Sequence, residues 1–265
     1  MHPADWRLIN GENLEALPSA LVRARGNAVA RRLAQSDWLI RRKGDGRFIA
    51  ARSGDTLHPF LRGALTPAVV TELALLAEAD AMGEQPRPLH GLLHGLHALG
   101  LDDSYGETTG LALVAEPCTL AFAGRDRYGR PLWLSRGASR AWRAMRQHAA
   151  TDDVTLEAIS GYRSHAYQMG IFRRKLQRGL AIEEILGVNA APGYSEHHSG
   201  NALDIGTPGE PAAEESFEAT QAFAWLAQHA GEHGMRMSYP RDNVHGIVYE
   251  PWHWYWHAAA VSDEA

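Results

Sequence analysis

Short apolar runs alternate with helical patterns from residue 111 to residue 256, and this alternation constrains the fold more than any other feature. The segment LALVAEPCTLAFAGRDRYGRPLWLS, residues 111–135, has two apolar runs around a turn-rich GRDRYGRP, which predicts a β-hairpin. Further strands are expected at 154–160, 201–206, 235–239 and 246–256, and helices at 139–150, 164–179 and 219–233. Strands interleaved with helices favour an α+β fold over a doubly wound parallel sheet, with a small mixed or antiparallel sheet flanked by helices.

The first 110 residues have a different pattern. Helices are predicted at 18–35, 66–82 and 89–99. The second is the clearest, because Thr66 is suited to cap it and Pro67 fits its first turn. The Gly-rich, acidic stretch at 99–110 is typical of a loop or boundary. We therefore predict a mainly helical N-terminal accessory region at 1–110, of unknown role, and a second domain at 111–262.

Charge and cysteine content exclude several kinds of site. The chain has 265 residues and a net charge of −5 with its 14 histidines counted as neutral. It has no broad basic surface for a nucleic-acid backbone, which argues against a nucleic-acid partner. Cys118 is the only cysteine, so an intramolecular disulfide and a thiolate metal site are both excluded. Any metal must be held by histidine and carboxylate side chains.

The first residues, MHPADWRLINGENLEALPSALVRARG, do not have the pattern of a secretory signal. They lack a basic leader, an apolar stretch of about 7–15 residues and a small-residue cleavage site. No apolar run approaches the roughly 20 residues of a membrane span. We expect no integral membrane segment and a cytoplasmic location by default, with periplasmic or extracellular action still open. The oligomeric state is not determined by the sequence.

Histidine and carboxylate side chains gather in two blocks, SEHHSGNALDIG at 195–206 and YEPWHWYW at 249–256. In the first block His197 and Asp204 are seven residues apart, with Gly200 between them where the chain needs a tight turn. Two imidazoles and one carboxylate leave one position of a tetrahedral zinc ion open to water, as a catalytic site requires. The two blocks therefore predict a catalytic metal site completed by a second histidine.

The second block supplies both that histidine and a base. Glu250 stands three residues before His253. Zinc lowers the pKa of a bound water to about 7, and Glu250 is placed to take the proton and deliver it to a leaving amine. Strict strand alternation would put Glu250 and His253 on opposite faces, so the site requires a bend, which Pro251 favours.

Together with SGYRSHAYQ at 160–168, these blocks resemble the VanY-type D-alanyl-D-alanine carboxypeptidase family of zinc peptidases, whose pattern is S-x-H-x-x-G-x-A-x-D followed by E-x-W-H. The matching residues are Ser195, His197, Gly200, Ala202, Asp204, Glu250, Trp252 and His253. The family's upstream S-G-Y-R-S is present at 160–164, with Gln168 at the expected distance from Arg163. Eight fixed residues in the right order make the resemblance specific.

The resemblance implies a zinc peptidase domain at 111–262 whose metal ligands are His197, Asp204 and His253. Glu250 is then the general base, and Arg163 is the electropositive group beside the scissile carbonyl. Its planar, permanently charged guanidinium suits an oxyanion or a peptide carboxylate. Ser195 and Gln168 are implied contacts to substrate. The implied activity is removal of a C-terminal D-amino acid, D-alanine, from a peptidoglycan stem peptide or muropeptide.

Two other functions stay open on the sequence alone. One is a peptidoglycan endopeptidase of the same metal fold, and the other is a non-catalytic wall-binding module; retention of Glu250 and Arg163 argues against the second. D,D versus L,D preference is also open. Three further histidines, at 90, 94 and 97, share one predicted helical face among leucines, which favours a packed or interface face over a metal site.

Overall fold

The structure, a computed structural model, describes residues 6–23, 26–60, 63, 65–89, 91–101 and 104–258. Its strands are β1 (Arg7–Asn10), β2 (Leu14–Pro18), β3 (Trp38–Arg42), β4 (Phe48–Ser53), β5 (Thr56–Pro59), β6 (Thr119–Arg125), β7 (Pro131–Leu134), β8 (Glu157–Ser160), β9 (Ala202–Gly206), β10 (Met235–Met237) and β11 (His253–Trp256). Its α-helices are α1 (Asn27–Ala34), α2 (Pro67–Met82), α3 (Leu92–His97), α4 (Tyr105–Thr109), α5 (Arg136–Thr151), α6 (His165–Gln177), α7 (Ile182–Gly187) and α8 (Gln221–His229). Short 3-10 helices are η2 (Ser19–Leu21), η3 (Glu196–Ser199), η4 (Glu215–Ala219) and η5 (Ala230–His233).

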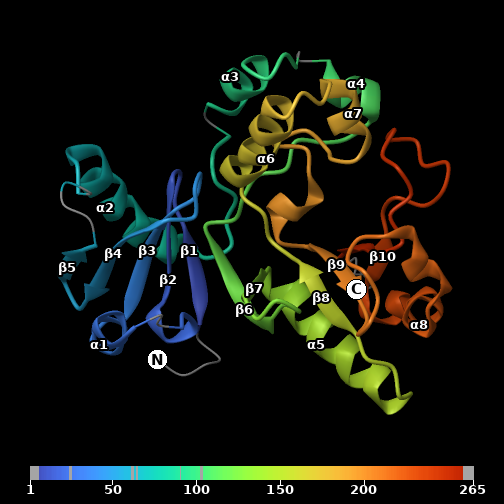
Figure 1. The fold of residues 1–265 in the computed structure, drawn as a ribbon, viewed down its shortest axis with the longest axis horizontal. Helices are drawn as coiled ribbons and strands as arrows, with labels where there is room; N and C mark the ends of the chain where they lie inside the picture. The colour runs from blue at the N-terminus through green and yellow to red at the C-terminus, as the bar shows by residue number, and fades with distance from the viewer. Residues whose placement is uncertain are drawn as a thin grey trace, which may run out of the picture.

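The larger of two sheets connects the two halves of the chain. It has seven strands in the order β5-β4-β3-β2-β1-β6-β7, and each neighbouring pair is antiparallel. Leu8 of β1 pairs with Leu120 of β6, so the hairpin β6–β7 continues the N-terminal sheet (Figure 1). The division at residue 110 stays a prediction, and the hairpin that we placed in 111–262 shares its sheet with strands from residues 7–59.

The smaller sheet carries strands from the second half of the chain alone. Its order is β10-β11-β9-β8, and all its pairs are antiparallel. The predicted α+β class and the predicted hairpin at 111–135 are both confirmed. The strand predicted at 246–256 is too long, because the chain turns at Pro251 and β11 begins only at His253.

The prediction of a mainly helical N-terminal region is incomplete. Helix α2 begins as expected: the Thr66 side chain accepts a hydrogen bond from the backbone N–H of Val69 at 3.3 Å, and Pro67 occupies the first turn. The strands β1–β5 were not predicted from the sequence. Strand β2 is buried at every position, so it lacks the apolar and polar alternation that identifies a half-buried strand.

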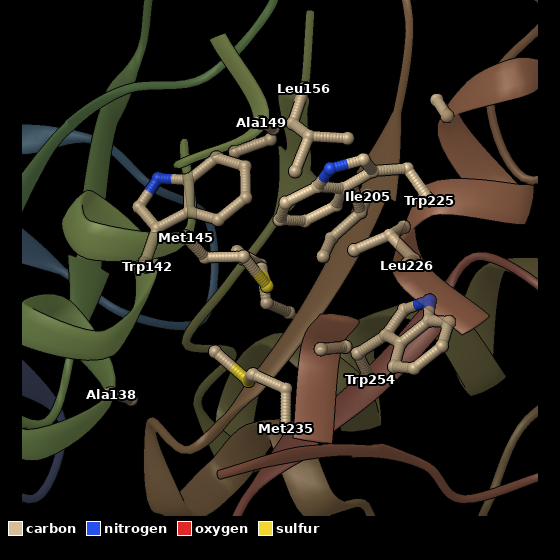
Figure 2. Packing of buried hydrophobic residues seen from close by; sticks show 14 of the residues in the cluster. Ala138, Trp142, Met145, Ala149, Leu156, Ile205, Trp225, Leu226, Met235 and Trp254 are labelled. Carbon is tan, nitrogen blue, oxygen red and sulfur yellow. The ribbon is translucent and has the colours of Figure 1, made fainter. Parts of the chain in front are cut away.

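The main core of the second half of the chain lies between α5, α8 and the smaller sheet (Figure 2). Helix α5 starts at the cap Ser135, whose hydroxyl accepts from the backbone N–H of Ala138 at 3.1 Å. Its buried face follows the helical repeat through Ala138, Trp142, Met145 and Ala149. From the sheet, Leu203, Ile205 and Trp254 pack into the same cluster. Side chains that alternate with these on β9 and β11 therefore face away from α5 and α8.

Among the described helices, none is long and apolar enough to span a bilayer.

Glu116, just before β6, is a buried carboxylate that receives donors from both halves of the chain. Lys43, at the end of β3, forms an ion pair with it, and both side chains are at most 5% exposed. Asn10 donates its amide to Glu116 Oε2 at 3.1 Å. The Tyr162 hydroxyl donates to the same oxygen at 3.0 Å, and the backbone N–H of His165 donates to Oε1 at 2.5 Å. The N-terminal sheet therefore fixes the segment 162–165.

This network predicts acid sensitivity with a defined sign. Burial raises the pKa of Glu116, but the charges of Lys43 and His165 lower it by more than this. The net effect brings the pKa from the usual 4.5 down to about 2. The folded-state pKa lies below the unfolded one, so the stabilisation is complete above about pH 4.5 and is lost as the pH falls towards 2. Between pH 6 and pH 3, wild type should lose about 2 kcal/mol more unfolding free energy than the double variant Lys43→Met, Glu116→Gln.

Urea unfolding of both proteins at the two pH values measures this difference. The single variant Lys43→Met is the matched control. It should be less stable at neutral pH than the double variant, because it leaves a buried carboxylate without its cation. Equal acid losses in wild type and the double variant would contradict the role of Glu116.

Candidate metal centre

One cavity of about 300 Å³ is lined by every site residue that the sequence predicts. These are Arg163, Gln168, Ser195, His197, Asp204, Glu250 and His253. They come from the loop after β8, from α6, from η3 and the residue before it, from β9, and from the turn into β11. The cavity opens on the face of the smaller sheet that lies opposite α5 and α8, since Asp204 and His253 alternate with core residues.

Strand pairing brings the two predicted ligands from distant segments together. Asp204 on β9 lies directly opposite His253 on β11. The third, His197, belongs to η3, which ends at Gly200 with φ of 74°, in the left-handed region that favours glycine. A Cβ at Gly200 would also lie 2.3 Å from Leu120 Cδ2, so glycine lets η3 approach β6 closely. The turn expected from the sequence is present.

His197, Asp204 and His253 offer ligand atoms that lie within 4.8 Å of one another, and all three residues are buried. His197 Nε2 is 3.3 Å from Asp204 Oδ2, and His253 Nδ1 is 3.1 Å from Asp204 Oδ1. Two ligands of a tetrahedral zinc ion at about 2.1 Å would be about 3.4 Å apart. The donor set and its spacing therefore suit a zinc ion, while the assignment of these residues as ligands stays a prediction.

Each histidine is oriented by a hydrogen bond on its other ring nitrogen. His197 Nδ1 lies 2.8 Å from the backbone oxygen of Gly161, which accepts from it and leaves Nε2 free for a ligand. His253 Nε2 lies 2.8 Å from Glu196 Oε2, which leaves Nδ1 facing Asp204. Such outer hydrogen bonds fix the tautomer of a metal-binding histidine. Glu196 was missed from the sequence, although it directly precedes His197.

Two carboxylates, Asp204 and Glu196, contact the ring of His253 through its two nitrogens. Burial raises the pKa of Asp204, but His197 and His253 lower it by more than this and hold it well below its usual range. Burial lowers the pKa of His253, yet hydrogen bonds to Asp204 and Glu196 outweigh burial and raise it to about 10. Without an ion, the carboxylates hold a proton on His253. A divalent cation would displace that proton and supply the same positive charge.

Glu250 is separate from the ligand cluster and stands beside it. Its Oε2 lies 3.8 Å from His253 Nδ1. The backbone N–H of His253 donates to the carbonyl of Glu250 at 3.1 Å, which closes the turn that the sequence argument required. Burial raises the pKa of Glu250 to about 7. A carboxyl group with this pKa exchanges protons readily near neutral pH, as a general base must.

Arg163 points its guanidinium into the same cavity. Its Nη2 lies 3.9 Å from Asp204 Oδ2, and its Nη1 donates to Gln168 Oε1 at 3.0 Å. Gln168 is fully buried and donates its amide to the backbone oxygen of Ala190 at 2.9 Å. Gln168 therefore holds Arg163, and its predicted contact with substrate stays a prediction. Ser195 lines the cavity and is 5% exposed.

Other histidines that the sequence singles out lie outside the ligand cluster. His198 is fully buried, accepts from the backbone N–H of Gly193 at 3.0 Å, and its Nδ1 lies 2.6 Å from the Arg163 carbonyl oxygen. It therefore supports the backbone of Arg163 from outside the cavity. Of the histidine triplet near residue 94, the one at position 90 lies outside the described residues. Within the described part of the chain, His94 and His97 belong to no cluster of potential ligands.

Comparison with known proteins finds one family to which the second half of the chain is similar. The family described as VanY, D-alanyl-D-alanine carboxypeptidase, matches residues 131–259. A D-alanyl-D-alanine carboxypeptidase of Enterococcus faecium is 32% identical over 104 residues, which are 38% of this chain and 33% of that protein. The bifunctional D-Ala-D-Ala dipeptidase and carboxypeptidase VanXYC of Enterococcus gallinarum is 30% identical over 129 residues, which are 46% of this chain and 66% of that protein. The chain thus matches a third to two thirds of these relatives.

Solved structures show partial likeness. The LdcB LD-carboxypeptidase is 29% identical with a TM-score of 0.44, and the match covers 47% of this chain and 59% of that one. The D,D-pentapeptidase VanY of a VanB-type resistance cassette, solved with Zn(II), is 25% identical with a TM-score of 0.41, and the match covers 50% and 76%.

The hydrogen bond between Glu196 and His253 yields a prediction about metal affinity. Glu196→Gln keeps the size of the side chain but removes the charge that orients and polarises the imidazole. We expect metal affinity to fall by about 10-fold to 100-fold, the usual effect of losing such an outer carboxylate. Competition titration of zinc against a chromophoric chelator measures the change. Glu183→Gln, an exposed position on α7, is the control and should bind as wild type; equal affinities in all three proteins would contradict the orienting role.

Proposed function

We propose that the chain, whose residues 131–259 match the VanY family of D-alanyl-D-alanine carboxypeptidases, is a zinc-dependent peptidase. Its proposed reaction removes a C-terminal D-amino acid, D-alanine, from a peptidoglycan stem peptide or muropeptide. One observation carries the proposal: the metal-type triad, a carboxyl group with a raised pKa and an arginine all line a single cavity. A metallopeptidase needs these three features within reach of one peptide bond.

In this proposal His197 Nε2, Asp204 and His253 Nδ1 hold the metal, which their mutual spacing supports. A zinc ion held there would supply Lewis-acid chemistry, polarising the scissile carbonyl and lowering the pKa of a water molecule. The protein's own contribution begins with orientation, since Gly161 and Glu196 fix the two imidazole rings. The Tyr239 ring packs at 4.9 Å from the His253 ring and shields it from solvent.

Glu250 moves the proton in the proposed reaction. Its carboxylate accepts a proton from the attacking water, and the resulting carboxylic acid returns that proton to the nitrogen of the departing D-amino acid. A pKa raised to about 7 by burial suits both steps, because acid and base forms are then nearly balanced at neutral pH. Arg163 donates hydrogen bonds to the oxygen on which negative charge develops, and Gln168 keeps its guanidinium in place.

The positive wall of the cavity supports cleavage at a free C-terminus. Lys175 of α6 lines the cavity together with Arg163. Burial lowers the pKa of Lys175, and repulsion from Arg163 lowers it further. Such a pair suits the terminal carboxylate of a peptide substrate, a group that an endopeptidase substrate lacks at the cleaved bond.

The proposal is tested by metal content and product mass. Chelation followed by verified metal removal should abolish hydrolysis of a defined pentapeptide muropeptide, and added zinc should restore it. Mass spectrometry should find a product shortened by one D-alanine. Full activity without metal would refute the metallopeptidase, and a cut inside the stem would replace the carboxypeptidase with an endopeptidase.

A pair of variants separates the base from a ligand. Glu250→Gln should keep zinc and fold but lower turnover by about 10²-fold or more, because an amide cannot accept the proton. Substrate binding should change far less than turnover. The comparison variant His253→Ala should lose both zinc and activity. If Glu250→Gln loses zinc as completely as His253→Ala while staying folded, Glu250 is a ligand and the base lies elsewhere.

A further inference from the structure

Three histidines lie close together where the end of α5 meets α8 and η5, outside the catalytic cavity. His148 lies in the last turn of α5, His229 ends α8 and His233 ends η5. The ring of His148 lies 5.1 Å from that of His229 and 5.4 Å from that of His233. His148 Nδ1 and His233 Nε2 are 3.2 Å apart. Segments about eighty residues apart in sequence thus bring three imidazole rings together.

Glu232 adds a carboxylate to this group. Its Oε1 lies 3.0 Å from His229 Nδ1, and its Oε2 lies 3.9 Å from His148 Nδ1. Ligand atoms of His148, His229 and Glu232 all lie within 4.8 Å of one another. Nitrogen and carboxylate donors at this spacing match the ligand set of zinc and of the neighbouring divalent transition metals.

A second observation concerns the other side of the His148 ring. Its Nε2 faces Asp152, with 4.0 Å between the nitrogen and Oδ2. The same oxygen accepts a hydrogen bond of 2.7 Å from the indole N–H of Trp225. Trp225 is buried, and its ring packs against both His148 and His229. The ring of His148 therefore has a carboxylate near Nε2, at ion-pair distance, while its Nδ1 is turned towards Glu232 and His233.

We propose that His148, His229 and Glu232, with His233 beside them, form a second binding site for a divalent transition metal ion. This site lies apart from the catalytic cavity. Ile205 and Trp254 of the smaller sheet pack against α5 and α8 (Figure 2), and Leu203 belongs to the same cluster. Asp204 and His253 face the cavity on the other side. A core layer therefore separates the two clusters, and the second one does not depend on the proposed peptidase function.

An ion bound there would connect the end of α5 to the α8–η5 segment. Because the unfolded chain does not bring these residues together, binding would stabilise the fold in proportion to metal concentration. The side chains of His148 and His229 are 35% and 22% exposed, so an ion can reach the site from solvent. The expected role is a metal crosslink between α5 and the α8–η5 segment, the helices that pack against β9 and β11.

The experiment counts ions on the full chain. After dialysis against micromolar Zn²⁺ and removal of free metal, mass spectrometric metal analysis should find about two zinc ions per wild-type chain, one for each three-ligand cluster. His148→Ala with His233→Ala should bind one fewer and keep peptidase turnover within about twofold. The control His58→Ala, an exposed histidine on β5, should bind as wild type. An unchanged count in the double variant would overturn the proposal.

A second measurement isolates this site from the catalytic one. In a His253→Ala background the catalytic triad is broken, so added Zn²⁺ should raise the thermal unfolding temperature through the second site alone. Adding His148→Ala to that background should remove the rise. A rise that persists without His148, or its absence in His253→Ala, would overturn the proposal, whereas failure of the peptidase assay would leave both readouts unaffected.

Discussion

The buried carboxylate of Glu116 determines how the two halves of the chain meet. A carboxylate inside a protein is tolerated only with several donors, and here the donors come from β1, from the end of β3 and from residues 162–165. Loss of Lys43 would leave the buried Glu116 carboxylate without its cation, and loss of the other donors would leave its oxygens without hydrogen bonds. The N-terminal sheet therefore stabilises the segment that carries Arg163, even though it contributes no residue to the lining of the cavity.

A second contact strengthens this dependence. The backbone N–H of Ser135, at the start of α5, donates to the carbonyl of Gly200 at 2.9 Å, and Gly200 lies against Leu120 of β6. Because η3 carries His197, the position of a predicted ligand is set partly by the seven-stranded sheet. Lys43 acts through Glu116 and Leu120 acts through Gly200. The N-terminal region, whose role the sequence left unknown, thus supports the segments that carry Arg163 and His197.

Local sequence patterns predicted the parts of the site that depend on short-range geometry. The sequence predicted a turn at Gly200 between His197 and Asp204, and Pro251 indicated the bend that puts Glu250 beside His253, whereas the set of ligands was implied by the family resemblance. The contact of Glu196 with His253 joins residues 57 positions apart, so no local pattern reveals it. Strand β2 was missed for a related reason: burial on both faces removes the alternation that marks a strand.

The two walls of the cavity have opposite charge, and this separation follows from the fold. Asp204 and His253 are fixed by strand pairing on one wall, with Glu196 and Glu250 beside them, so the negative groups lie at the sheet. The positive wall comes from the loop after β8 and from α6, which bring Arg163 and Lys175. A peptide ending in a carboxylate would be drawn to the cations and would place its last carbonyl towards the sheet. A cation at the triad and an anion at Arg163 then stabilise each other across the cavity.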